Sequence, residues 1–238
     1  MRKAFILLLS LVLIFSLAAC GKKTENTPSD SSTTSTQGSS TDTPSNSEKS
    51  GDGIKVGDTY TFGGKDWIVI DVVKDEKALI ISKAIIEIKA FNVESGDHTW
   101  ENCDLRKYLN GDYFNNTFSD VERSKILETD VKAVKNTEYP NVLIGNDTKD
   151  NVFLLSIQEA AQYFADDNAR IAKYTSDDGT TLPNEWYLRT VGLNNESTSF
   201  INAEGKLNLA GATNDAEYGV RPAIWIDIKP ETADSSTN

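Results

Sequence analysis

The chain has 238 residues, with 36 acidic side chains against 24 basic ones and a net charge of −12. Residues 53–230 alone hold 29 acidic and 19 basic residues, a net −10. Charge therefore does not draw this protein to nucleic acid or to an anionic membrane surface, and neither is expected as a partner on that basis.

The N-terminus has the features of a bacterial secretory leader. Two basic residues precede an apolar stretch over 4–17, and Leu17-Ala18-Ala19 comes directly before Cys20. This arrangement resembles the lipobox of bacterial lipoproteins, which implies cleavage before Cys20 and a lipid on its sulfur. The stretch is too short for a transmembrane helix, which needs about 20 apolar residues. An ordinary signal peptide cut elsewhere is the other alternative. We expect a signal peptide over 1–19 and lipidation at Cys20.

Residues 20–52 are expected to form a disordered tether behind the lipidated cysteine. Ser, Thr, Pro, Asp and Gly dominate this segment, and it contains too little apolar surface to offset the entropy of ordering. The polar tail 231–238 is expected to be disordered as well. Residues 53–230, about 178 in number, suffice for one hydrophobic core, so one domain is predicted.

Strand patterns open this domain. Residues 59–62 and 67–73 flank Gly63-Gly64, and the second run is apolar on both faces, which predicts a central strand. A polar turn over 74–77 leads to a partner strand over 78–82. The two runs together predict a hairpin.

Helices are predicted next. One is expected over 103–110, with Gly111 as its C-terminal cap. Ser119-Asp120-Val121-Glu122 is a capping box that starts a helix through about residue 127. Ser156-Ile157-Gln158-Glu159 is a second capping box, and it follows an expected strand over 152–155.

The last third returns to strands. A strand is predicted over 186–189, a hairpin over 200–209 turns at Gly205, and a final run over 218–226 is interrupted by Pro222. Strands, then helices, then strands, without βαβ alternation, predict an α+β fold. We expect a single domain with mixed or antiparallel strands and short helices.

Four segments resemble a family of uncharacterised bacterial domains, DUF6273. They are Trp67–Asp71, Thr99–Asn110, Trp186-Tyr187-Leu188-Arg189-Thr190 and Gly219-Val220-Arg221-Pro222-Ala223. The match spans roughly 60–228, and Thr190 stands where the family pattern has serine. The family has no assigned activity, so the resemblance implies no reaction. The ending is also similar to that of C-type-lectin-like folds, where an arginine before the final strand pins loops from beneath. This similarity implies a C-type-lectin-like fold.

Three residues are candidate ligand contacts. Arg189 and Arg221 lie in apolar strands and could each grip a carboxylate. A structural ion pair with an acid such as Asp104, Glu101 or Glu185 is the favoured interpretation of these arginines. Trp100 lies in the polar run 96–102 and is the aromatic side chain expected to be exposed.

No catalytic residue, metal or cofactor is predicted. His98 is the only histidine, and Cys103 lies among acidic residues that raise a thiol pKa, so Cys103 is expected to be a buried bystander. One histidine and one cysteine do not make a zinc site. Acidic pairs such as Asp166-Asp167 lack EF-hand spacing. The carboxylates leave open a glycosidase pair, whose separation a sequence does not reveal.

These features predict an extracytoplasmic lipoprotein on a Gram-positive-like cell membrane. Its domain is expected to bind a cell-wall glycan or an envelope, surface or extracellular protein without catalysis. One alternative is a carboxylate-dependent hydrolase acting on cell-envelope glycans. Another is the solute-binding lipoprotein of a transporter, although such proteins need two α/β lobes.

Overall fold

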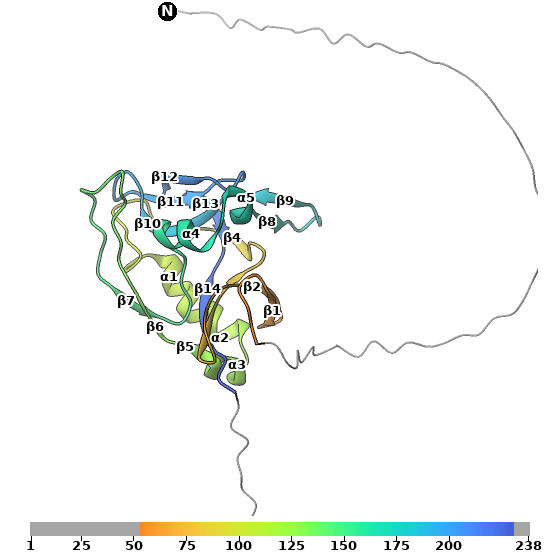
Figure 1. Cartoon of the computed structure of the whole chain (residues 1–238). Coiled ribbons are helices and arrows are strands. Elements are labelled where there is room, and N and C mark those ends of the chain that lie inside the picture. The colour runs from red at the N-terminus through yellow and green to blue at the C-terminus, as the bar shows by residue number, and fades with distance from the viewer. Residues whose placement is uncertain (1–52, 231–238) are drawn as a thin grey trace, which may run out of the picture. The chain divides into compact units, whose positions relative to one another are not determined.

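Strands dominate residues 53–230, the part of the chain that the computed structural model describes (Figure 1). The expected signal peptide, Cys20, the tether and the tail 231–238 lie outside the described residues. The predicted α+β class, with short helices and one domain, is confirmed for the described part. No helix within 53–230 is long and apolar enough to cross a membrane.

Sheet A has five antiparallel strands in the order β1-β2-β3-β14-β5. In sheet order they are β1 (Thr59–Phe62), β2 (Lys65–Val73), β3 (Lys77–Ser82), β14 (Ala223–Asp227) and β5 (Ile126–Leu127). The predicted β2–β3 hairpin is confirmed, with Val73 opposite Lys77. The last strand of the chain enters this sheet between β3 and β5, so the sheet joins both ends of the domain.

Sheet B has the order β12-β11-β10-β13-β4 and is antiparallel except between β10 and β13. Its strands are β12 (Leu207–Thr213), β11 (Ser197–Ile201), β10 (Trp186–Val191), β13 (Glu217–Val220) and β4 (Glu87–Ala90). The expected hairpin between β11 and β12 is confirmed, and Gly205 has a positive φ of 81° in its turn.

The chain passes from sheet B to sheet A within two residues. Strand β13 ends at Val220 and β14 begins at Ala223, so Arg221 and Pro222 alone span the passage. The predicted break at Pro222 is thereby confirmed. Proline has no backbone N–H to donate, but its carbonyl accepts a hydrogen bond from the Ser82 amide at 2.9 Å.

Two small hairpins lie outside the main sheets: β6 (Thr129–Val131) with β7 (Thr148–Asp150), and β8 (Ala172–Thr175) with β9 (Thr181–Asn184). Figure 1 shows β8 and β9 extending away from the sheets. The helical segments are α1 (Asp104–Tyr108), a π-helix (Leu109–Tyr113), α2 (Phe114–Thr117), α3 (Asp120–Lys125), α4 (Ile157–Tyr163) and α5 (Asp167–Arg170).

Both predicted capping boxes are confirmed, but the expected helix end at Gly111 is wrong. The chain continues through a π-helical turn that contains Gly111 and on into α2. Leu109 and Tyr113 on this turn are both buried, at 0% and 5% exposed. Burying two large side chains outweighs the cost of about 1 kcal/mol that glycine adds within a helix.

The expected strand over 152–155 is also wrong, although the segment is buried. Only Phe153 pairs, through a single antiparallel bridge to Ala223. The next carbonyls turn toward β10, because the Leu155 oxygen accepts from the Arg189 amide. The segment therefore links the two sheets instead of extending one of them.

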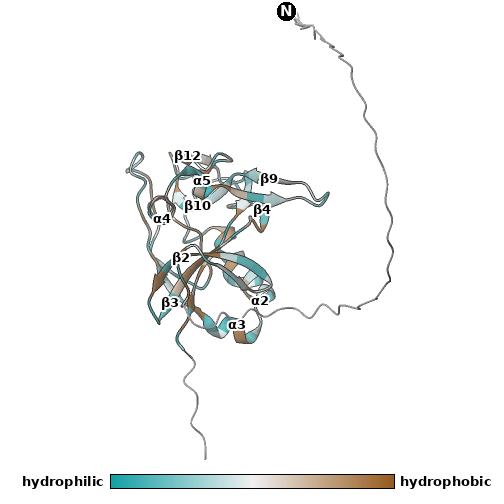
Figure 2. Cartoon of the chain, turned by 45° about the vertical axis from the view of Figure 1, so that its right-hand side comes forward, coloured by the Kyte–Doolittle hydropathy of each residue, from teal (hydrophilic) through white to brown (hydrophobic). Residues whose placement is uncertain are grey.

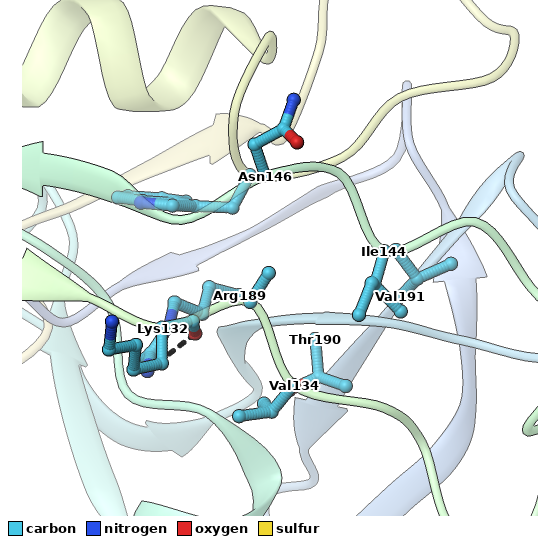
Figure 3. Close-up of a pocket in the computed structure, with 9 residues that line it drawn as sticks. Lys132, Val134, Ile144, Asn146, Arg189, Thr190 and Val191 are labelled. Carbon is cyan, nitrogen blue, oxygen red and sulfur yellow. Dashed lines mark hydrogen bonds between the residues drawn. The ribbon is translucent and has the colours of Figure 1, made fainter.

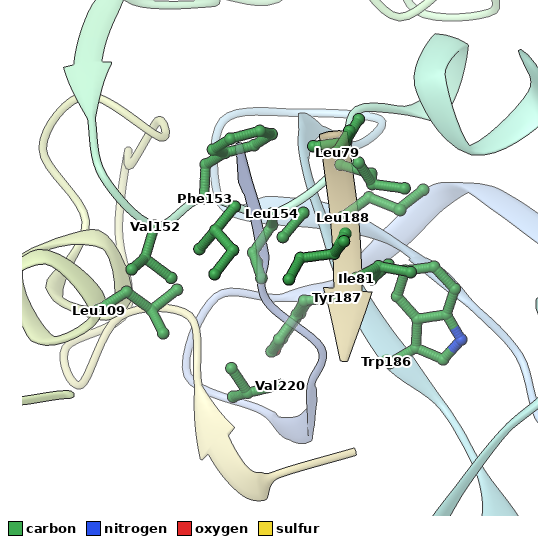
Figure 4. Close-up of a cluster of buried hydrophobic side chains, with 14 of the residues drawn as sticks. Leu79, Ile81, Leu109, Val152, Phe153, Leu154, Trp186, Tyr187, Leu188 and Val220 are labelled. Atoms are coloured by element: carbon green, nitrogen blue, oxygen red, sulfur yellow. The ribbon is translucent and has the colours of Figure 1, made fainter. Parts of the chain in front are cut away.

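The hydrophobic core lies between these elements. Figure 4 shows Leu79 and Ile81 of β3 close to Leu154 and Leu188, while Leu109 and Val152 pack beside them. In Figure 2 the apolar colour concentrates on β2, β3 and the strands behind them, and the loops are mostly hydrophilic. The core thus supports loops at the edge of sheet B, where polar residues gather.

Gly205→Ala should destabilise the fold far more than Gly179→Ala. Both glycines have a positive φ, +81° and +83°, so alanine is strained at either site by about 1 kcal/mol. At Gly205 a Cβ would also lie 1.8 Å from the Asp167 carbonyl oxygen, whereas nothing lies within 4 Å at Gly179. We expect a loss of at least about 3 kcal/mol at Gly205, measured by urea unfolding. Equal losses at both sites would contradict this packing.

Candidate functional site

A groove of about 490 Å³ lies where three loops meet. Its walls are formed by residues 97–102, by residues 142–146 and by Asn195 in the loop after β10. Two carboxylates (Asp97 and Glu101), three carboxamides (Asn102, Asn146 and Asn195) and the apolar run Val142-Leu143-Ile144 line it. The groove therefore offers a polar floor beside an apolar edge.

Hydrogen bonds and close packing join the walls of the groove. Asn195 accepts a hydrogen bond from the Leu143 amide at 3.2 Å and donates to the Leu143 carbonyl at 2.7 Å. Gly145 packs so closely that a Cβ there would lie 2.6 Å from the Thr99 hydroxyl oxygen. Loop 142–146 is thus fixed against both of the other walls.

A buried asparagine holds two of the walls from beneath. Asn214 is 0% exposed, and its Nδ2 donates to the carbonyls of Gly96 and Asn195, both at 3.0 Å. Its Oδ1 accepts from the Thr198 hydroxyl at 2.7 Å. All these side-chain hydrogen bonds are made within the protein, so the buried amide contributes order without an unpaired group.

Asn136, between β6 and β7, is a second buried asparagine, and it ties that segment to β10 and β12 of sheet B. It is 0% exposed, donates to the Val191 and Leu209 carbonyls, and accepts from the Glu138 amide. Sequence reasoning selected neither this residue nor Asn214. Nothing in a sequence distinguishes a buried, fully bonded asparagine from an exposed one, because its partners lie far away along the chain.

Within the groove, Glu101 is already engaged. Asn146 donates to its carboxylate from the backbone at 2.9 Å and from Nδ2 at 2.9 and 3.0 Å. The Asn146 side chain and then its backbone amide lower the pKa of Glu101 below the usual 4.5. Among residues 53–230, the Asp97 carboxylate and the Asn102 Nδ2 have no hydrogen-bond partner. These two groups are free to meet a ligand.

Trp100 is buried, and the expectation of an exposed ring is wrong. It is 6% exposed, and its indole N–H donates to the Asp150 carboxylate at 2.8 Å. That carboxylate is itself fully buried and also accepts from Arg106 and Thr148. A buried carboxylate needs donors, and the indole turns inward to supply one.

Arg189 forms a buried ion pair, as the favoured interpretation held, but with a different partner. Its guanidinium binds both carboxylate oxygens of Glu159 and donates to the Leu154 carbonyl at 2.7 Å. Asp104, Glu101 and Glu185 are not its partners. Glu159 is the last residue of the second capping box, so one carboxylate both caps α4 and neutralises Arg189.

Trp100 and Arg189 meet at a small cavity of about 10 Å³ beneath Ile144 and Asn146. Figure 3 shows Arg189 donating to the Lys132 carbonyl there, while the Asn146 carboxamide points away from the cavity. The volume is about the smallest that holds one water molecule. Both candidates therefore support the groove from behind, and neither is placed to touch an organic ligand.

Arg221 lies elsewhere, and the expectation of an ion pair is wrong for it. It is 1% exposed, with its guanidinium 4.9 Å from the Trp186 ring centre and 5.3 Å from that of Phe164. It donates to the Ser82 carbonyl at 2.9 Å and to that of Arg170 at 3.4 Å. Burial lowers the pKa of Arg221 to about 10, so it stays charged at neutral pH, and rings and carbonyls take the place of a carboxylate.

Cys103 is buried, as predicted. Its sulfur accepts a hydrogen bond from the Arg106 amide at the start of α1, and burial raises the pKa of the thiol to about 12. Such a thiol is not a nucleophile at neutral pH. Within 53–230, no three His, Cys, Asp or Glu side chains gather closely enough to hold a metal ion.

Comparison with protein families places this domain. A family model described as a domain of unknown function, DUF6273, matches residues 75–228. The chain belongs to the DUF6273 family. The matched region includes all three walls of the groove and the passage from β13 to β14. No curated protein and no solved structure matches the chain.

Glu159→Gln should weaken the DUF6273 domain in a pH-dependent way. Burial alone would raise the pKa of Glu159, but Arg189 and then Ser156 lower it below 4.5 overall. Because the pKa of Glu159 is lower in the folded state than in the unfolded state, its ionised form stabilises the fold. This stabilisation is fully present above the unfolded-state pKa of 4.5 and is lost as the pH falls through the folded-state pKa. We expect a loss of about 2 kcal/mol at neutral pH that shrinks as the pH falls below 4.5 toward the folded value.

The measurement is urea unfolding of both proteins between about pH 7 and pH 3. Glu204→Gln, on the exposed β11–β12 turn, is the matched control and should follow the wild type. An unfolding free energy of Glu159→Gln that runs parallel to the wild type at every pH would contradict the pairing.

Asn146→Ala should raise the pKa of Glu101 toward 4.5. The Asn146 side chain is the main cause of the lowered value, and alanine removes it while keeping the backbone donor. Carboxyl ¹³C NMR titration measures the change. Asn151→Ala, whose side chain does not contact Glu101, should leave the value where it is; an unchanged pKa in Asn146→Ala would show that the groove wall is not joined as described.

Proposed function

We propose that this DUF6273 chain is an extracytoplasmic lipoprotein whose groove binds an envelope or extracellular ligand without catalysis. The location is supported by the leader, whose Leu17-Ala18-Ala19 precedes Cys20. The observation that carries the binding role is a pair of free polar groups, Asp97 and Asn102, in a groove whose walls are fixed by internal hydrogen bonds. Preorganised walls lower the ordering cost of binding.

The lining restricts the charge of the ligand. None of the described residues that form the groove is cationic, whereas Asp97 and Glu101 are both acidic. An anionic ligand would meet repulsion there, so the ligand is neutral or positively charged. Leu143, 69% exposed at the rim, adds an apolar contact.

These features favour a protein surface that presents lysine or arginine beside an apolar side chain. The hydroxyl groups of a cell-wall glycan also suit Asp97 and Asn102. Sugars, however, usually stack on an exposed aromatic ring, and Trp100 behind the groove is buried. The glycan is therefore the second candidate.

A C-type-lectin-like architecture is part of the proposal. It is supported by Arg221, which precedes the last strand and donates to the carbonyls of two distant segments. In such folds an arginine at this place holds loops from beneath.

A carboxylate-dependent hydrolase is supported less well. Such an enzyme needs one carboxyl group with a raised pKa to donate a proton. The pKa of Glu101 is lowered instead. A transporter's solute-binding protein would close two lobes on its ligand, while the described residues belong to one compact unit.

The anchor is tested by Cys20→Ser in the producing cell. We expect the wild type in the membrane fraction with diacylglycerol on its N-terminal cysteine by mass spectrometry, and the variant without lipid. An unmodified wild-type chain that keeps residues 1–19 would overturn the proposed location.

Binding is tested by calorimetry with a decalysine peptide, a decaglutamate peptide and soluble cell-wall glycan fragments. We expect the lysine peptide to bind, and Asp97→Asn to weaken it about fivefold or more. Asp177→Asn on the β8–β9 turn, an equal change in net charge far from the groove, should leave the affinity unchanged. Equal weakening by both variants would mean charge attraction without a site, and release of sugar from the glycan would favour the hydrolase.

A further inference from the structure

We infer that His98 is a pH-operated latch on the groove: it holds loop 91–98 in place only while its imidazole is neutral. The link to ligand binding rests on the proposed function, but the latch itself does not. His98 is the only histidine of the chain, and it lies between Asp97 and Thr99, which both line the groove.

The first step is the orientation of Asn92, which is 4% exposed. Its Oδ1 accepts from the Asp104 amide at 3.0 Å, and its Nδ2 donates to the Glu94 carbonyl at 2.9 Å. If the carboxamide were turned over, its NH₂ group would face the Asp104 N–H, so that two donors met. Its oxygen would face the Glu94 carbonyl, so that two acceptors met. The nitrogen of Asn92 therefore faces His98.

This orientation decides the tautomer of His98. The Asn92 Nδ2 lies 2.8 Å from His98 Nε2, and an amide nitrogen only donates. Nε2 must accept, so it carries no proton, and the imidazole is neutral with its proton on Nδ1. Nδ1 is buried and has no hydrogen-bond partner among residues 53–230.

Protonation breaks this arrangement. An imidazolium carries N–H groups at both nitrogens, so Nε2–H would point at the N–H of Asn92 across 2.8 Å. Nothing is gained at Nδ1, whose environment is already without an acceptor. The ring has to leave its place when it takes up a proton.

The Asp104 carboxylate lies against the loop that the ring would leave, and further acidic residues lie on the loop and beside it. Asp104 on α1 is close enough to His98 to interact with its charge. The pKa of Asp104 is lowered mainly by Lys107 and then by the Val93 amide, and the positive form of His98 lowers it further. Lys107 on α1 pairs with Asp104 at 2.9 Å, and Arg106 on the same helix pairs with Asp150. Glu94 and Asp97 lie on the loop itself, and Glu196 and Asp215 are the next residues after Asn195 and Asn214, whose carbonyls accept from the loop's amides. Tyr187, which packs against Phe91, is a further ionisable neighbour. A displaced imidazolium thus has anionic partners in place of Asn92.

The movement would reach the groove through the backbone. The His98 amide donates to the Asn195 carbonyl at 2.9 Å, and the Gly96 carbonyl accepts from Asn214. Asn195 in turn holds Leu143. Loss of the latch at acidic pH would loosen the wall that carries Asp97 and weaken its contact with loop 142–146.

The test uses the full chain in detergent, with ¹⁵N-labelled histidine and amide hydrogen exchange at about pH 7.5 and pH 5, the range in which histidines change charge. At the higher pH we expect the Nδ1–H tautomer. After correction for intrinsic rates, amide exchange over 92–98 should rise about tenfold at the lower pH, as expected for local opening.

Two variants make the outcome specific. His98→Gln places a non-titrating acceptor near Nε2 and should keep the loop closed at both pH values. Asn92→Asp accepts from the imidazolium and should reduce or reverse the pH effect. An Nε2–H tautomer in the wild type, equal exchange at both pH values, or the same pH effect in His98→Gln would overturn the latch.

The two proposals fail separately. If decalysine does not bind at any pH, the proposed function fails, while the exchange data still decide the latch. If the loop opens at the lower pH but decalysine binds equally at both pH values, the latch exists but does not control binding. The inferred link between the latch and the groove is then wrong.

Discussion

The guanidinium of Arg221 lies at the passage from sheet B to sheet A, where two residues separate β13 from β14. A buried cation without a carboxylate is costly unless other groups replace the lost water. Here two aromatic rings and two carbonyls do so. Because one of those carbonyls belongs to Ser82 at the end of β3, the same side chain ties the two sheets together. Through Trp186 on β10 and Ser82 on β3, this one side chain contacts both sheets.

The neighbours of Arg221 show why the sequence Gly-Val-Arg-Pro-Ala suits this place. A Cβ on Gly219 would lie 2.5 Å from the Glu185 carbonyl oxygen, so glycine permits the close approach of β13 to the chain before β10. Ala223 is fully buried and exchanges two backbone hydrogen bonds with Phe153, at 2.7 and 3.0 Å. Gly219, Arg221 and Ala223 thus each meet a steric or hydrogen-bonding requirement of the crossing.

Features decided by neighbours in sequence could be predicted here. The two capping boxes, the β2–β3 and β11–β12 hairpins and the break at Pro222 each depend on residues a few positions apart. Gly111 was misleading because the burial of Leu109 and Tyr113 is a tertiary effect. Capping and turn residues thus determine where helices and strands end, except where the burial of large side chains favours a different end.

The site could not be predicted in the same way, because its contacts join distant segments. Trp100 donates a hydrogen bond to Asp150, and Arg189 donates one to Glu159, each thirty or more residues away along the chain. The groove combines residues near 100, 144 and 195. One sequence signal was present: the apolar run Val142-Leu143-Ile144 stands in an otherwise polar loop and precedes Gly145, which has a positive φ of 73°. An apolar run in a loop is typical of a surface that is covered by a partner.

The two ends of the described chain leave the domain on the same side. Figure 1 shows the start of the coloured ribbon and the end of β14 close to α2 and α3, while the segment between β6 and β7 rises toward the opposite end of the domain, beside sheet B. The described chain therefore begins and ends on the side of sheet A, the groove lies on the side of sheet B, and the hydrophobic core lies between them.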